Sequence, residues 1–185
     1  AYPATLSRLL GAAAAEHLAA LAVGLDDRPV ETEREEKSIS REHTFAEDEA
    51  DVAVVRATLL DLAADVARRT REAGRFASTG KIKLRWADFT TLTRQEGFAT
   101  PACDDFTFRE TALRLFEREP LRGRRVRLIG FGVTGLSDSR VVQPGLFVAE
   151  ADVVREKRER VSRALDAIRD KLDGGAIGFG GATRD

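Results

Sequence analysis

The stretch that decides the fold is Thr79–Arg94, TGKIKLRWADFTTLTR. In its first half apolar and basic residues alternate strictly, the apolar ones being Ile82, Leu84 and Trp86 and the basic ones Lys81, Lys83 and Arg85. Such alternation predicts a half-buried strand, because successive strand side chains point to opposite faces. Phe89–Arg94 predicts a second strand, and Ala87-Asp88 predicts the turn between them. We therefore expect a β-hairpin with one basic face.

Segments with other periodicities flank this hairpin. Further strands are predicted for Lys37–Phe45 and for Val126–Val133, which is apolar but interrupted by two glycines. Amphipathic helices are predicted for Asp51–Ala73 and Asp104–Arg118. The resulting order, βαββαβ, is the ferredoxin-like arrangement. We therefore predict an α+β fold in which a four-stranded antiparallel sheet carries two helices on one face, leaving the other face for water or a partner.

The two ends of the chain differ from this central unit. An Ala- and Leu-rich helix is predicted for Leu6–Ala22, and a charged tether for Asp26–Glu36. After Val133 the regular pattern is lost, and Val154–Leu172 then predicts a charged helix with a narrow apolar stripe. We therefore expect four parts, formed by residues 1–25, 26–36, 37–136 and 137–185.

Composition excludes several classes of protein. The formal net charge is −1, so the overall charge balance does not indicate a nucleic-acid partner. One cysteine cannot form an internal disulfide, and two histidines do not suggest a metal cluster. The sequence shows neither an apolar run of bilayer length nor a signal peptide. We expect a cytoplasmic location and no membrane partner.

The basic face of the hairpin is the strongest candidate for a binding surface. Its three cations point from one face, and hydroxyl groups on the neighbouring strands add donors suited to phosphate oxygens. Such a surface should bind a nucleic-acid backbone with little sequence preference. One alternative is a solvated basic strand without a partner. Another is an RNA-recognition module, which needs exposed aromatic residues that these strands do not offer.

Three long segments resemble one known family. They are Arg34–Asp48, Lys83–Arg94 and Arg127–Leu136, and Leu21–Val30 looks like the end of that family's thumb domain and its linker. They resemble the little-finger domain of bacterial Y-family translesion polymerases of the DNA polymerase IV type. The resemblance covers most of the chain. It implies an end of thumb at residues 1–25, a linker at 26–36, a little finger at 37–136 and a tail at 137–185.

The resemblance also implies the partners and the contacts. The sheet would lie in the major groove of template-primer DNA and contact backbone phosphates through Lys37, Ser38, Ser40, Arg41, Lys81, Lys83, Arg85, Thr91, Thr93, Arg94, Arg125 and Arg127. Catalysis would belong to a parent polymerase whose palm holds Mg²⁺ on acidic residues, together with fingers and thumb that are missing here. We therefore expect no catalytic residue, metal ligand or cofactor in this chain, and no activity from it alone.

The segment Gln143-Pro144-Gly145-Leu146-Phe147 resembles the peptide with which bacterial polymerases and repair proteins bind the sliding clamp, the β subunit. The expected contacts are Gln143, through directional hydrogen bonds, and Leu146 and Phe147, through an apolar pocket. The alternative is that the two apolar residues cover the domain edge. The function predicted is DNA gripping and clamp tethering in lesion bypass. The competing hypothesis is a catalytically inactive relative that serves as a clamp-linked scaffold.

Overall fold

The computed structural model describes residues 2–26, 28–29, 37–139, 150–172 and 177. Its internal contacts divide the chain into two units, Ala1–Glu35 and Glu36–Asp185. Each unit is described by itself. None of the helices in the described ranges combines the length and the apolar character needed to cross a membrane.

The first unit is a pair of short helices, α1 (Tyr2–Leu10) and α2 (Ala12–Ala22). The single helix predicted for Leu6–Ala22 is wrong, because Gly11 interrupts it with φ 87°. Glycine adopts this left-handed conformation without the steric cost that a Cβ atom imposes, and it is a poor residue for a helix interior. Leucines stay exposed on both helices.

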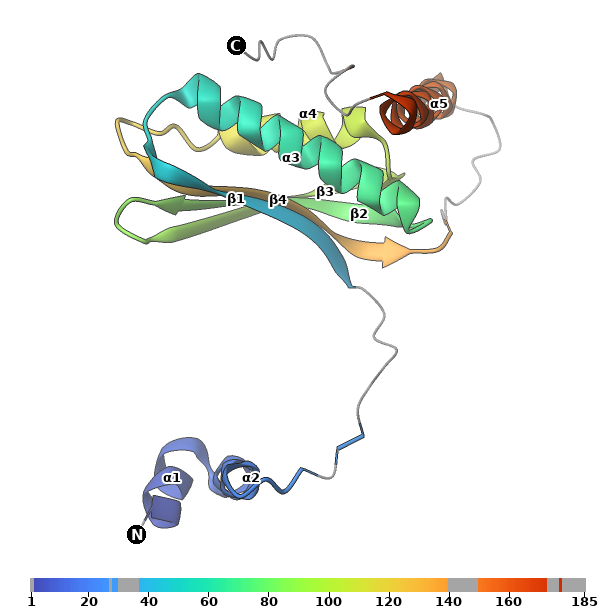
Figure 1. Cartoon of the computed structure of the whole chain (residues 1–185). Helices are drawn as coiled ribbons and strands as arrows, with labels where there is room; N and C mark the ends of the chain where they lie inside the picture. The colour runs from blue at the N-terminus through green and yellow to red at the C-terminus, as the bar shows by residue number, and fades with distance from the viewer. Residues whose placement is uncertain (1, 27, 30–36, 140–149, 173–176, 178–185) are drawn as a thin grey trace. The chain divides into compact units, whose positions relative to one another are not determined.

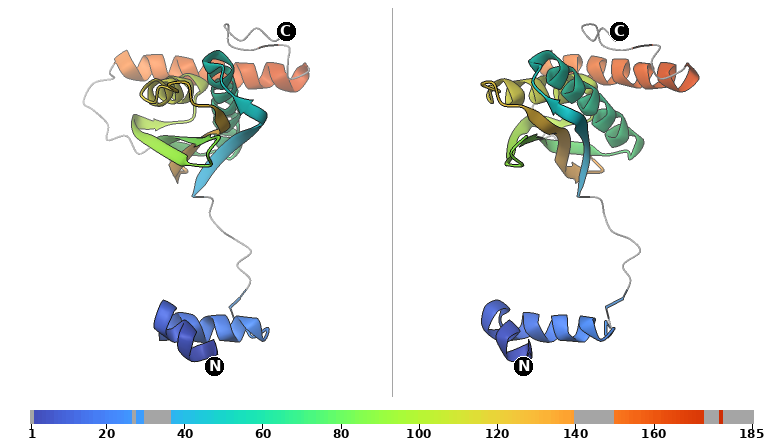
Figure 2. Two further views of the ribbon diagram at one scale, coloured as in Figure 1. Left: turned by 90° about the vertical axis from the view of Figure 1, so that its left-hand side faces the viewer. Right: turned by 60° about the vertical axis from the view of Figure 1, so that its left-hand side comes forward.

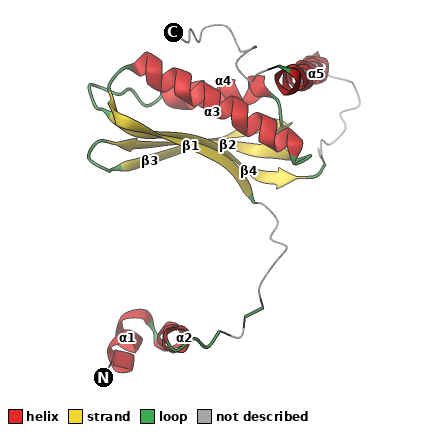
Figure 3. Cartoon of the chain, viewed as in Figure 1, coloured by secondary structure: helices red, strands yellow, loops and turns green. Residues whose placement is uncertain are grey.

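The second unit is built on a four-stranded antiparallel sheet. The strands are β1 (Ser38–Glu49), β2 (Phe76–Trp86), β3 (Thr91–Ala102) and β4 (Val126–Ser137), and their order in the sheet is β1-β4-β2-β3. Helices α3 (Val52–Glu72) and α4 (Asp105–Glu117) cover one face of the sheet, as Figures 1 and 3 show. The predicted α+β fold with βαββαβ order is therefore confirmed.

The core lies between these two helices and the sheet. Its largest fully buried side chains come from α3, α4 and the two central strands, and they include Leu59, Phe108, Leu115, Ile82, Leu84, Ile129 and Phe131. Each helix begins at an aspartate whose carboxylate accepts a backbone hydrogen bond. Asp51 accepts from Ala53 N at 2.7 Å, and Asp104 accepts from Thr107 N at 2.9 Å. These caps satisfy amide groups that have no partner within the helix.

Strand β4 differs from its prediction. Its two glycines do not break it, because it continues to Ser137 and pairs with β1 and β2 past both positions. Strand β3 begins at Thr91, two residues later than predicted, because Phe89 lies in the turn with φ 64°.

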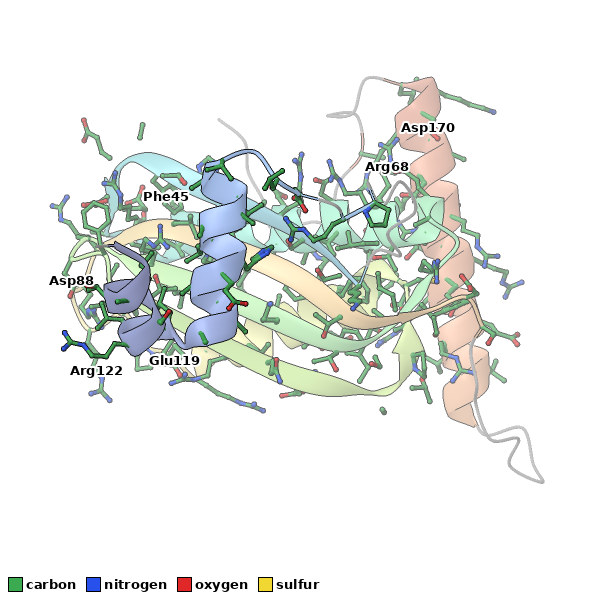
Figure 4. The ribbon with its side chains drawn as sticks, turned by 90° about the horizontal axis from the view of Figure 1, so that it is seen from below. Phe45, Arg68, Asp88, Glu119, Arg122 and Asp170 are labelled. Atoms are coloured by element: carbon green, nitrogen blue, oxygen red, sulfur yellow. The ribbon has the colours of Figure 1, made fainter. Side chains whose placement is uncertain are left out.

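Helix α5 (Glu150–Lys171) packs on the helical side of the same unit (Figure 2). Its contacts are polar, since Ser162 Oγ accepts a hydrogen bond from Asp105 N at 3.1 Å and the carboxylate of Asp166 binds Arg71 of α3. Figure 4 shows Arg68 and Asp170 at this end of the unit, and the two form an ion pair at 2.9 Å. The helix predicted here is present, but most of its apolar stripe remains exposed.

Arg71 is the centre of this attachment. Its side chain is only 6% exposed, and it contacts Asp105 at 2.8 Å and Asp166 at 2.7 Å. Burial alone would lower the pKa of Arg71, but hydrogen bonds to Asp166 and the charge of Asp105 outweigh burial and raise that pKa. The buried guanidinium is therefore charged and paired.

Candidate nucleic-acid interface

The sheet face opposite the helices is the candidate interface, and we call it the open face. Strand pairing arranges its side chains in rows that run across all four strands. Three of these rows are Ser40, Gly132, Lys81 and Gln95; then Glu42, Gly130, Lys83 and Thr93; and then Thr44, Leu128, Arg85 and Thr91. The rows bring hydroxyl groups from the two edge strands to the sides of a basic central strand.

The alternation predicted for β2 is confirmed. Ile82 and Leu84 are fully buried and Trp86 is 6% exposed, whereas Lys81, Lys83 and Arg85 are partly exposed on the open face. Arg85 Nε donates to Thr91 Oγ1 at 3.0 Å, which ties this guanidinium to the next strand. Lys81 makes no ion pair with another described residue. The basic strand therefore presents cations that water still reaches.

One carboxylate shares this face. Lys83 Nζ donates to both carboxylate oxygens of Glu42, at 2.9 and 3.0 Å. Glu42 was not among the contacts predicted from the sequence, and neither were Gly130 in its row and Gly132 in the neighbouring row. The signal was available, because Glu42 alternates in step with Ser38 and Ser40.

The turn between β2 and β3 forms one end of the face. Phe89 is 63% exposed, and the guanidinium of Arg127 lies 4.6 Å from the centre of its ring. Arg124 stands 4.1 Å from the ring of Trp86 and also donates to Thr90 Oγ1 at 2.9 Å. Figure 4 shows Asp88 at this end, opposite Asp170. Hydrogen bonds from Thr90 lower the pKa of Asp88, so its carboxylate stays ionised among these arginines.

Two predicted contacts are placed on the other face. Arg41 and Arg94 stand in one row with Phe131 and Ile82, which face the helices. Arg41 Nε contacts Asp65 of α3 at 2.5 Å, and Arg94 Nε contacts Glu119 at 2.6 Å. Both arginines occupy edge strands, where a long side chain can reach a carboxylate beside or beyond a helix. The structure therefore does not bring them together with Lys81 and its neighbours.

The remaining predicted contacts divide between the open face and its ends. Ser38 and Ser40 are exposed on β1, and Lys37 is exposed just before it. Arg125 Nη1 donates to the Asp48 carbonyl at 3.3 Å, and Arg127 approaches the Asp48 carboxylate at 3.5 Å. The proposed clamp contacts Gln143, Leu146 and Phe147 lie outside the described residues.

No metal-binding group stands out among the residues that the structure describes, where no three His, Cys, Asp or Glu side chains gather as ligands would. Asp26 is an exposed carboxylate beside the described Arg28, and hydrogen bonds from Arg28 lower the pKa of Asp26 to about 2. An exposed carboxylate paired with its neighbour in this way is a turn feature.

Comparison with known proteins gives a consistent result. The model of the impB/mucB/samB family C-terminal domain matches residues 36–146. A DNA polymerase IV of Dehalococcoides mccartyi (strain ATCC BAA-2266) is 37% identical over 179 residues, which are 96% of this chain and 44% of that protein. A DNA polymerase IV of Streptomyces coelicolor is 42% identical over 146 residues, covering 79% of this chain and 30% of that protein.

A solved complex of the beta-clamp processivity factor and the little finger domain of PolIV is also similar, with 26% identity and a TM-score of 0.46. The match covers 60% of this chain and 99% of that one. The chain spans less than half the length of the two curated relatives described above.

Proposed function

The chain contains the C-terminal domain of the impB/mucB/samB family and so belongs to that family, and from this premise we propose that its sheet grips template-primer DNA for a Y-family polymerase that copies damaged templates. The family's relatives are polymerases, so the polymerase parent is the natural setting for the domain. The arrangement of side chains on the open face supports the DNA-binding part of this proposal.

The observation that carries the proposal is the uncovered basic strand. Lys81, Lys83 and Arg85 stand on the open face, about 7 Å apart at strand rise. Because both helices of the βαββαβ fold lie on the other face, this surface can meet a duplex without any rearrangement of the domain. Cations so placed attract phosphates and release counterions from the DNA.

The chemistry of the face favours contacts that do not depend on base sequence. Its donors are ammonium, guanidinium, amide and hydroxyl groups, and the three rows described above contain no aromatic side chain. Donors of this kind bind phosphate oxygens and position a protein without reading bases. A polymerase that moves past altered bases needs a hold of this type, because the hold is the same whatever the template sequence.

Catalysis belongs, in this proposal, to the parent polymerase. A palm domain would hold Mg²⁺ ions, and these would stabilise the attacking and leaving oxygens of nucleotidyl transfer. The present chain would contribute DNA positioning and no catalytic residue, so that it is inactive alone.

A second contact completes the proposal. Gln143, Leu146 and Phe147 would bind the bacterial sliding clamp, on the strength of the peptide pattern that follows β4. Once the clamp is held, DNA binding becomes effectively intramolecular, so a weak grip suffices to retain the polymerase.

The DNA grip is tested by changing Lys81, Lys83 and Arg85 to Ala and measuring duplex binding by fluorescence anisotropy at several salt concentrations. Affinity should fall alike for two unrelated duplex sequences, and the slope of log K against log salt should become shallower by about 2 to 3, since about 0.9 is lost per phosphate contact. A loss confined to one sequence would contradict backbone binding.

The matched control removes three cations from the helical side. Arg69, Arg118 and Arg163 are 45%, 60% and 66% exposed in their side chains and lie on helices or at their ends. Their triple change to Ala alters the net charge as much as the open-face change does. If the two triple variants lose the same affinity, net charge and not the open face governs binding.

The clamp contact is tested by calorimetry with the purified clamp, comparing the chain with a variant in which Gln143, Leu146 and Phe147 are all Ala. The variant should lose clamp binding and keep duplex affinity, because the change leaves Lys81, Lys83 and Arg85 of the open face in place. Absence of binding by the unmodified chain would remove the clamp from the proposal and leave the DNA grip untouched.

A further inference from the structure

The centre of the open face is hollow. Strand β4 has glycine at two successive positions on this face, Gly130 and Gly132, so backbone lies there without side chains. The hollow has a volume of about 160 Å³, and its walls include Ser40, Lys81, Lys83 and Thr93. It combines a backbone floor with two ammonium and two hydroxyl groups.

Glu42 is the acidic residue in this wall. It lies on β1 and reaches Lys83 on β2 across the intervening strand, at 2.9 and 3.0 Å. The crossing is possible because Gly130 stands between them, since a Cβ atom at Gly130 would lie 2.8 Å from Glu42 Cγ. The glycine therefore creates both the hollow and the ion pair that spans it.

The ion pair is accessible to a competitor. The side chains of Lys83 and Glu42 are 31% and 40% exposed, so water reaches both groups. A phosphodiester oxygen that enters the hollow would meet the ammonium groups of Lys81 and Lys83 and the hydroxyls of Ser40 and Thr93. It would also meet the carboxylate, which repels it and occupies the same ammonium.

We propose that the glycine hollow seats one phosphodiester group of bound DNA and that Glu42 is a built-in competitor that limits the affinity of this seat. The inference rests on the proposed DNA grip and adds a residue that opposes it. Without DNA, Glu42 holds Lys83 over the hollow. When DNA binds, the phosphate displaces the carboxylate from Lys83, and the energy of the lost ion pair is subtracted from binding.

The competitor is tested with E42Q, which keeps the size of the side chain and removes its charge. Duplex affinity at about 0.1 M salt should rise roughly threefold to tenfold, because an exposed ion pair and a phosphate repulsion no longer oppose binding. The salt slope should steepen by up to about 1, since a freed carboxylate no longer takes up a cation when DNA binds.

The matched control is E72Q. Glu72 pairs with Arg68 on α3 at 2.7 Å, so this change also removes one carboxylate and one exposed ion pair, but on the helical side. Its duplex affinity should stay within a factor of two of the unmodified chain. An equal gain in E72Q and E42Q would overturn the inference, because the effect would then come from net charge alone.

A second pair of variants tests the seat. Adding a methyl group at Gly132 fills part of the hollow, but its Cβ would lie 2.7 Å from Ser40 Cβ. The double change G132A with S40G relieves that contact, and S40G alone is its control. We expect the double variant to bind duplex at least threefold more weakly than S40G, at equal thermal stability, and equal binding would overturn the seat.

The outcomes separate the inference from the proposed function. If E42Q binds like the unmodified chain while the Lys81, Lys83 and Arg85 triple variant loses affinity, the DNA grip stands and the competitor is refuted. If neither variant changes duplex binding, the open face is not the DNA-binding surface and both proposals fail.

Discussion

The two faces of the sheet carry the same kinds of charged residue and use them in opposite ways. On the helical face, Arg71 is buried between Asp105 and Asp166. On the open face, Lys81 makes no ion pair with a described residue, and Lys83 has one that water can reach. The difference lies in which face the helices cover.

Whether helices lie over a charged side chain determines whether it is paired within the fold or stays available to an external ligand. A buried ion loses its hydration and must recover the energy from a partner with good geometry, so cations beneath helices are paired within the fold. On an uncovered face water supplies the hydration, and a cation can remain available for an external anion. The number of basic residues is therefore a poor predictor of anion binding, and the face of the sheet on which they lie is a better one.

Removal of Arg71 should give the largest effect on the helical side. R71A leaves Asp105, which is fully buried, without its closest cation, and such loss of one partner costs about 3–5 kcal/mol. Urea unfolding followed by circular dichroism measures the free energy of unfolding. We expect α5 to lose its attachment in the same variant, which proteolysis between α5 and the sheet would detect.

Arg68 provides the comparison for that experiment. It also binds α5, through Asp170, but its side chain is 37% exposed. R68A should cost at most about 1 kcal/mol. Equal losses in R68A and R71A would contradict the view that cover determines the energetic role of these arginines.

A glycine on the open face should give an intermediate effect on stability, in contrast to the lysines beside it. G132A overpacks the contact with Ser40 and should lower the free energy of unfolding by about 1–3 kcal/mol. K81A, in the same row, should change it by no more than about 0.5 kcal/mol, because it removes an uncovered surface side chain. Thermal unfolding of both variants measures these losses of stability. A larger loss of stability in K81A than in G132A would contradict the prediction.

The smallest expected effect is on the stability of the fold at acidic pH. Hydrogen bonding and charge from Arg114, with a contribution from Arg118, lower the pKa of Glu96. This pair therefore stabilises the fold above the ordinary glutamate pKa, and the contribution is lost as the pH falls through the lowered value. It is at most about 1 kcal/mol, because Arg114 is 48% exposed. E96Q should lose less free energy of unfolding than the unmodified chain as the pH falls from about 5 to about 3.

Central parts of the fold could be predicted from the sequence because their residue patterns are compatible with only one type of secondary structure. Strict alternation in β2 fixes a strand and its two faces, and aspartates before α3 and α4 mark their first turns. The glycines of β4 were misread as interruptions. Glycine weakens a strand, but pairing on both sides holds β4 together, and that pairing is a property of the sheet.

The placement of the predicted contact residues depends on strand alternation and on partners that are distant in sequence. Arg41 and Arg94 are predicted as phosphate contacts by the family resemblance, and the alternation that places Ile39 inward assigns Arg41 to the helical face. Their partners Asp65 and Glu119 are distant in sequence, so no local pattern announces these ion pairs. Glu42 was not among the predicted contacts, although its alternation with Ser38 and Ser40 places it on the open face.

The partition of charge between the two faces also bears on how the chain would meet DNA. With a formal net charge of −1, the chain as a whole has no attraction to a distant polyanion. The field of the open face is screened within about 8–10 Å at physiological salt, so a duplex is attracted only after the correct face has turned toward it. Encounter would then be slow and dependent on orientation, without electrostatic steering to accelerate it.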